Sequence, residues 1–192
     1  MTQEKEIIEE RIKQQRQQYA TIETGMYACG EIIEFRKIDL FDGEMSLMIP
    51  DEFIEMPVKF QKVKYPSEYR SQIIMTSLDL SINLGLTMYL QNAEKRDVKV
   101  ITESIKNTIK RANPDYRFFK SGDHREEECP YCWFDFRSYA FDDAVYNIQF
   151  IMLIEKKILQ GSFNCPYSKA EDWRKVMIQI MKSIKKNGGE RS

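Results

Sequence analysis

The chain has 192 residues, 42% of them hydrophobic and 31% charged, which suits a single globular domain with its own core. Its 29 basic and 30 acidic residues leave a formal net charge of -1, so it lacks the basic excess of nucleic-acid-binding proteins. No stretch reaches the roughly 18 apolar residues of a membrane span, and the first residues lack the apolar core of a signal peptide. We therefore expect a cytoplasmic protein with reduced cysteines, no nucleic-acid partner and no membrane insertion.

The N-terminal segment is predicted to form a polar helix. Residues 4–19 are rich in Glu, Lys, Gln and Arg, and Ile7, Ile8, Ile12 and Tyr19 form a thin apolar stripe along them. This pattern fits a solvated extension, or a helix that packs on a partner or on a second copy in a homodimer. The expected division of the chain is a helical extension at 1–24, one domain at 25–187 and a tail at 188–192.

Strands are predicted through the next third of the chain. Alternating apolar residues over 32–49, interrupted by Asp42-Gly43, indicate a hairpin that ends at Pro50. Residues 51–72 are expected to be an irregular connection, followed by a strand at 73–77. The strict alternation over 82–90 predicts a strand with one buried face.

The remaining elements are two helices and more strands. Apolar residues at helical spacing predict a helix over 94–112, which Asn113-Pro114 ends. A weak strand at 116–120 precedes three strong ones, at 131–140, 145–154 and 157–164, with turns at 141–144 and 155–156. Connections this short require antiparallel neighbours.

The C-terminal helix has the clearest pattern. Ser168 and Glu171 are spaced as a capping box, and Gly188-Gly189 is the expected end. One apolar face is predicted to pack on the sheet, formed by Trp173, Val176, Met177, Ile180 and Ile184. The whole chain is thus predicted to be an α+β domain built on a largely antiparallel sheet.

The motif Cys129-Pro130-Tyr131-Cys132 matches the active-site sequence of glutaredoxins. Redox chemistry requires the first cysteine at a helix N-terminus, where the thiol pKa is lowered. Here an aromatic, strand-like run follows the motif and Glu126-Glu127-Glu128 precede it. We interpret the two cysteines as residues at the start of a strand, with a thiol protein as the alternative.

A zinc site is a second alternative for the cysteines. Cys129 and Cys132 have the spacing of a zinc knuckle, and Cys29 and Cys165 would complete four thiolates. These last two do not form a second C-x-x-C pair, so the pattern is incomplete. No metal is therefore expected.

The sequence shows no pattern for catalysis or cofactor binding. His124 is the single histidine and lies in a polar segment interpreted as a loop, and no nucleophile-elbow motif is present. The glycines form no phosphate-binding loop. We expect a protein that is not an enzyme and uses no cofactor.

Methionine is abundant, with ten residues in the chain. Methionine is flexible and polarizable, and it is common both in cores and on surfaces that accept varied apolar partners. Met45, Met75, Met88 and Met152 fall on predicted strands and are candidates for contact with a partner, with burial in the core as the alternative.

The order of these landmarks resembles the DcrB-like branch of the PsbP-type fold family over residues 26–186. The landmarks are the hairpin running into Met48-Ile49-Pro50-Asp51-Glu52-Phe53, then Tyr65-Pro66, the strands at 73–77 and 80–90, the helix, the three-strand meander, Trp173 and Ser183-Ile184. The resemblance implies an α/β/α sandwich, a curved antiparallel sheet with helices on both faces, that serves as a binding scaffold.

The resemblance also suggests a role. Cytosolic relatives include chaperones that hold the apolar N-terminal helix of a secreted effector, often as dimers. The first hypothesis is therefore an adaptor or chaperone for a secreted effector or toxin that uses an apolar sheet surface. The alternatives are a toxin-neutralising partner protein of the same fold, or a thiol or zinc protein using Cys129 and Cys132.

Overall fold

The centre of the molecule is a seven-stranded antiparallel sheet. The computed structural model describes residues 3–140 and 143–188. The strands lie in the spatial order β6 (Ile54–Glu55), β7 (Ile73–Thr76), β8 (Asn83–Tyr89), β12 (Lys157–Pro166), β11 (Ala144–Ile154), β10 (Tyr131–Tyr139) and β9 (Arg117–His124). The predicted meander is confirmed as β10, β11 and β12, although residues 141 and 142 of its first turn lie outside the described residues.

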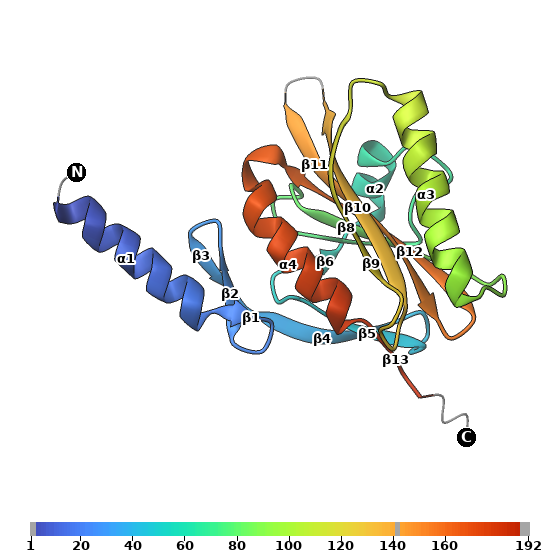
Figure 1. Ribbon diagram of the computed structural model, residues 1–192, viewed down its shortest axis with the longest axis horizontal. Helices are drawn as coiled ribbons and strands as arrows, with labels where there is room; N and C mark the ends of the chain where they lie inside the picture. Colours follow the sequence, from blue (N-terminus) through green and yellow to red (C-terminus); the bar gives the residue numbers. More distant parts are fainter. Residues whose placement is uncertain (1–2, 141–142, 189–192) are drawn as a thin grey trace.

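Helices cover both faces of this sheet. Helix α4 (Ala170–Ser183) packs on one face, where it buries Trp173 against the face that holds Phe163. Helix α3 (Lys95–Ala112) packs on the other face, which holds Ile151. Figure 1 shows the two helices on either side of the strands. Alternate residues of a strand point to opposite faces, and here a helix covers each face, so the sheet is buried on both sides. The predicted α+β fold is confirmed.

Smaller elements complete the two layers. On the α4 side lies a second sheet of β4 (Phe35–Leu40), β5 (Met45–Pro50) and β13 (Lys185–Lys186), and β4 and β5 form the predicted hairpin. Helix α2 (Val58–Lys64) leads to Tyr65, whose hydroxyl accepts a hydrogen bond of 3.0 Å from Asn164 on the α3 face. A 3-10 turn, η1 (Tyr167–Lys169), directly precedes α4.

The N-terminal extension is confirmed as a helix, α1 (Gln3–Gln18), which extends away from the sheet (Figure 1). It joins a small sheet of β1 (Ala20–Thr21), β2 (Gly25–Ala28) and β3 (Glu31–Ile33). Arg16 at its end lies 3.7 Å from Asp172 of α4. Ile7 and Ile8 remain more than half exposed, so the apolar stripe is free along the outer part of the helix.

Three local predictions were wrong. Residues 51–72 contain β6 and α2 and are not wholly irregular. Ser168 belongs to η1, and Lys169 is the residue before α4 without a side-chain cap, because the chain already turns helically there. The helix ends at Ser183 rather than at Gly188-Gly189, since the next residues pair with β5 as β13. Gly189 lies outside the described residues.

The four methionines considered as partner contacts are part of the core. Met45, Met75, Met88 and Met152 are each at most 5% exposed. They lie on the sheet face and hairpin that α4 covers. The structure therefore corrects the expectation of an open apolar sheet surface at these residues: the second, smaller sheet and α4 bury that face.

One buried carboxylate links the sheet to α4. Asp135 of β10 is 0% exposed, and its Oδ2 accepts hydrogen bonds of 2.7 Å from the Tyr146 hydroxyl and 2.7 Å from Arg174 Nε. Its Oδ1 accepts from the backbone N–H of Lys120 in β9 at 2.6 Å. Burial, with the negative charge of Asp135 beside it, raises the pKa of Tyr146 far above its usual range, so this phenol stays a neutral donor.

We predict that Asp135→Ala lowers the free energy of unfolding by about 3–5 kcal/mol, because it leaves Arg174 and the Tyr146 hydroxyl facing an unpaired buried site. Urea denaturation measures this change. The matched control is Asp115→Ala at an exposed carboxylate, which is expected to change stability by less than about 0.5 kcal/mol. Equal effects of the two substitutions would contradict a structural role for Asp135.

Candidate functional site

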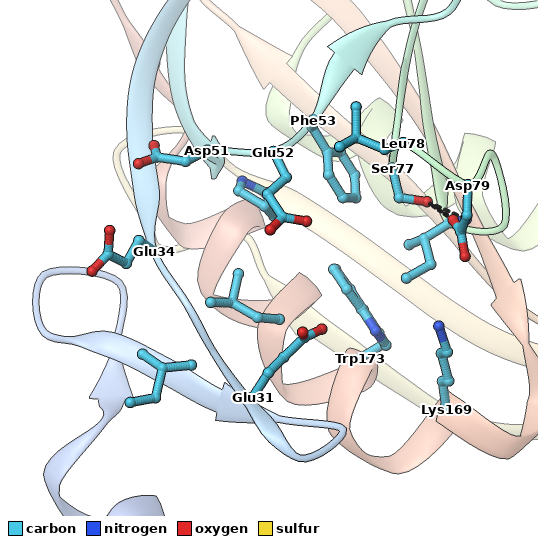
Figure 2. A pocket seen from close by; sticks show the side chains of 14 residues that line it. Glu31, Glu34, Asp51, Glu52, Phe53, Ser77, Leu78, Asp79, Lys169 and Trp173 are labelled. Carbon is cyan, nitrogen blue, oxygen red and sulfur yellow. Dashed lines mark hydrogen bonds between the residues drawn. The ribbon is translucent and has the colours of Figure 1, made fainter.

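An acidic cleft lies where three distant parts of the chain meet beside the start of α4. Its walls come from the β3–β4 junction, from the segment after β5 and from the β7–β8 loop, and it encloses about 330 Å³. This volume falls in the range of ligand pockets, roughly 300–1,000 Å³. Figure 2 shows the side chains that line it.

The floor of the cleft is aromatic. Phe53 and Trp173 stack with ring centroids 5.8 Å apart, and Phe163 stacks on the other side of Trp173 at 5.7 Å. The backbone fixes Phe53, because its N–H donates to the carbonyl of Pro50 at 2.9 Å and its carbonyl accepts from Arg36 at 2.7 Å. These two hydrogen bonds fix the backbone of Phe53 beside Trp173.

Apolar side chains also stand at the edge of the cleft. Leu78 is 68% exposed and Ile32 is 40% exposed, and both line the cavity. They lie on different segments, the β7–β8 loop and β3. A partner that covered both of them would remove apolar surface from water, which favours association.

The rim of the cleft is acidic. The lining includes five carboxylates and a single lysine, Lys169, and the five are Glu31, Glu34, Asp51, Glu52 and Asp79. Figure 2 shows Glu31 and Glu52 extending toward the two rings, with Asp79 and Lys169 on the other side, whereas Glu34 and Asp51 point away from the rings. Opposite charges of a ligand would be attracted here, and the mixture of apolar floor and acidic rim suits a group that is cationic and apolar together.

Asp79 is held in its charged form by its own loop. Ser77 Oγ donates to Asp79 Oδ1 at 2.5 Å, and the backbone N–H and the hydroxyl of Ser81 donate at 2.9 Å and 2.8 Å. These hydrogen bonds, from Ser77 first, lower the pKa of Asp79 to about 2. The carboxylate therefore keeps its negative charge at every pH above that value.

The four cysteines do not form a common site. Cys129 packs in the core under α4, whereas Cys132 packs on the opposite face of the sheet under α3. Cys165 faces the α4 side of the core, and Cys29 lies exposed in the β2–β3 turn. Within the described ranges, no three residues among His, Cys, Asp and Glu are arranged to hold a metal ion. The two cysteines of the C-x-x-C motif begin a strand, as its sequence context predicts.

The environment of the thiols disfavours the thiolate. Burial, with Asp123 nearby, raises the pKa of Cys132 to about 11, and burial raises that of Cys165 to about 12. Burial also raises the pKa of Cys129 and Cys29 above the usual value for a thiol. A nucleophilic or redox cysteine requires the opposite shift.

His124 was wrongly interpreted as a loop residue. It is the last residue of β9, and its ring stacks on Tyr131 with centroids 4.6 Å apart and planes inclined by 14°. The strand is longer than the predicted 116–120 because it pairs with β10 as far as this residue. In this position the imidazole covers an aromatic side chain at the edge of the core.

The acidic cleft was not among the sites predicted from the sequence. Its carboxylates are spread over residues 31–79, and Trp173 comes almost a hundred residues later. The available signal was the segment Pro50-Asp51-Glu52-Phe53, in which two acids directly precede an aromatic residue. Only the folded chain brings this segment against Trp173.

Comparisons with known proteins identify the fold. The sequence matches no protein-family model, and no curated protein is significantly similar to it. Among solved structures, the chain is similar to cyanobacterial PsbP (CyanoP) from Synechocystis sp. PCC 6803, with a TM-score of 0.60 and 11% identity over 85% of this chain and 98% of that one. The predicted PsbP-type fold is thereby confirmed.

Two further structures share the fold. LpqN of Mycobacterium tuberculosis, described as involved in cell envelope biogenesis, has a TM-score of 0.52 and 9% identity over 78% of this chain and 90% of its own. A protein from Bacteroides thetaiotaomicron VPI-5482 has a TM-score of 0.52 and 12% identity over 82% of this chain, which spans 50% of that protein. At these identities the likeness establishes the fold alone. No helix in the described ranges has the length and apolar character needed to cross a bilayer.

We predict that iodoacetamide at pH 8 labels Cys29 in the native protein and leaves the other three cysteines unlabelled until the protein is unfolded, because Cys29 is exposed and the other three are buried. Mass spectrometry of tryptic peptides reports each site. The labelling of Cys132 in the native protein should stay far slower than that of Cys29 at the same pH, because burial withholds its thiol from the reagent and raises its pKa to about 11. Rapid labelling of Cys129 or Cys132 at pH 7, or zinc in the purified protein, would restore the thiol or zinc hypothesis.

Proposed function

We propose that the chain is a non-catalytic binding protein that holds a basic, amphipathic segment of a protein partner in the acidic cleft. The observation that carries the proposal is the pairing of a stacked aromatic floor, Phe53 and Trp173, with a lining that holds five carboxylates and one lysine. A segment that carries lysine or arginine beside leucine or isoleucine is complementary to both parts of the cleft. The floor would receive the aliphatic part of such side chains, and the rim would neutralise their charge.

The partner is proposed to be a protein segment rather than a small metabolite. The lining of the cleft offers carboxylates, apolar groups, Ser77 and Lys169. Exposed Leu78 and Ile32 extend the apolar surface beyond the floor, so the contact area continues past the cavity itself. A helix with one apolar face could bury both residues at once, in the manner of groove-binding helices.

In its more specific form, the proposal is an adaptor or chaperone for a secreted effector or toxin, whose N-terminal helix would occupy the cleft. Because Met45, Met75, Met88 and Met152 are buried, the proposal assigns this helix to the acidic cleft rather than to the sheet face that they occupy. We place the role in the cytoplasm, because four free thiols suit a reducing compartment. A toxin-neutralising partner protein would use the same surface, and identification of the bound segment separates the two.

A synthetic helical peptide of leucine and lysine is the probe for this proposal. It is expected to bind, and binding should weaken with salt because the rim is exposed to solvent. The double variant Glu31→Lys with Glu52→Lys should lower the affinity about tenfold, since attraction at two rim positions becomes repulsion. Fluorescence anisotropy of the labelled peptide measures the affinity.

Two controls make the result specific to the cleft. The variant Glu68→Lys with Glu103→Lys makes the same change in net charge at exposed positions outside the cleft lining and should retain the affinity. A peptide with glutamate in place of each lysine should fail to bind. If both double variants weaken binding equally, the attraction belongs to the net charge of the protein, and the cleft is not the site.

A further inference from the structure

A second cavity lies on the other side of α4, between this helix and the edge strand β9. It encloses about 770 Å³ and is lined by Lys120 and Ser121 of β9, Trp133 of β10, the η1 turn, and the outer face of the first two turns of α4. It shares no lining residue with the acidic cleft. The two cavities therefore flank the start of the same helix.

Trp133 lines this cavity, and its indole carries a buried donor without a partner among the described residues. Trp133 is 6% exposed, and its Nε1 finds no acceptor among the described residues. A Cβ atom built on Gly122 would lie 2.2 Å from this nitrogen, so the indole N–H lies directly over the glycine of the edge strand. A buried donor left without an acceptor costs about 1–3 kcal/mol, and a ligand oxygen would remove that cost.

A second unpartnered donor lies beside the cavity. Arg137 stacks on Tyr139 and on Tyr167, at 5.0 Å and 5.1 Å from the ring centroids, and its buried Nε has no acceptor in the described part of the chain. Tyr167 itself lines the cavity. Arg137 is not itself a lining residue, and its stacking on Tyr167 places it behind the wall of the cavity.

The lining of the cavity carries more cationic than anionic side chains. Lys120, Arg174 and Lys175 line it with Glu171 as the acidic member, and Lys175 Nζ lies 3.5 Å from Glu171 Oε1. The Nε–H of Arg174 donates to Asp135 Oδ2 and to the Tyr146 hydroxyl. Among the described residues, the two terminal amino groups of Arg174 make no hydrogen bond, so the outer edge of the guanidinium is free to bind a ligand. Arginine in this arrangement binds planar or tetrahedral oxyanions through two parallel hydrogen bonds.

We propose that this cavity binds an oxyanion, a carboxylate or phosphate group, through Arg174, Lys120, Lys175 and the indole N–H of Trp133. The acceptor that the buried indole lacks would be an oxygen of the ligand, and the lysines would neutralise its charge. Asp135 positions Arg174 for this contact from the opposite side of the guanidinium. This site would bind an anion, whereas the acidic cleft would bind a cationic segment. The two proposals do not depend on each other.

The two tryptophans allow the two sites to be observed separately. The chain contains Trp133 and Trp173 and no others, one in each cavity. In ¹H–¹⁵N spectra of the full chain, titration with inorganic phosphate or with succinate should move the Trp133 Nε1–H resonance and leave that of Trp173 in place. The Leu-Lys peptide should move the Trp173 resonance and leave that of Trp133 in place. A negative result at one site therefore does not affect the test of the other site.

Variants test whether the cavity residues make the contact. Lys120→Ala and Lys175→Ala should each weaken binding of the effective anion about two- to fivefold. Trp133→Phe keeps an aromatic side chain but removes the indole N–H, and it should weaken anion binding about tenfold or more. Because this variant lacks the indole resonance, the titration is followed at the backbone amide of Ser121. The matched control is Lys182→Ala, which removes a lysine of α4 outside the cavity and should leave affinity unchanged.

The choice of anion distinguishes the two sources of the oxyanion. A response to phosphate alone identifies a phosphate-bearing ligand, and a response to succinate alone identifies a carboxylate ligand. Sodium chloride at equal ionic strength is the reference for both titrations. If neither anion moves the Trp133 resonance beyond that reference, or if Trp133→Phe and Lys182→Ala bind equally, the proposed site is wrong.

Discussion

The arrangement of both cavities depends on the buried ion pair between Asp135 and Arg174. It joins β10 to α4 at 2.7 Å, and the same carboxylate accepts hydrogen bonds from Tyr146 of β11 and from the backbone of β9. Close packing of the apolar face of α4 already resists sliding of the helix on the sheet, and the buried charge adds a penalty to any register in which Asp135 loses Arg174. Since successive helix residues point about 100° apart, fixing Arg174 also directs Trp173 toward the acidic cleft.

The consequence is a separation of charge that the composition conceals. The chain is almost neutral, with a net charge of -1. Around the start of α4, however, the lining of one cavity holds five carboxylates and one lysine, and the lining of the other holds three cations and one carboxylate. A local field of this kind acts over about a Debye length, 8–10 Å at physiological salt, so each cavity senses mainly its own residues. Net charge therefore does not describe the local charge of either binding surface.

The secondary structure was largely predictable because it rests on local periodicity. The alternation in residues 82–90 and the short turns of the meander required antiparallel strands, and β8 and β10–β12 follow them. The capping box at Ser168 and Glu171 failed because the same spacing also fits a 3-10 turn leading into the helix. The methionines were ambiguous for another reason: alternation shows that a strand has two faces, but it does not tell which face another layer covers.

The candidate site was harder to predict, since its parts are common residues that become unusual only by position. Asp135 did carry a signal: it is one acid within the aromatic run Trp133–Phe136, and it lies on the same strand face as Trp133. The rim carboxylates carried none, because exposed acids occur throughout the chain. They lie in loops and at strand ends, the parts of a fold that vary most between proteins sharing a sheet. A fold shared with CyanoP at 11% identity therefore fixes the scaffold, and the function has to be tested at the loops around α4.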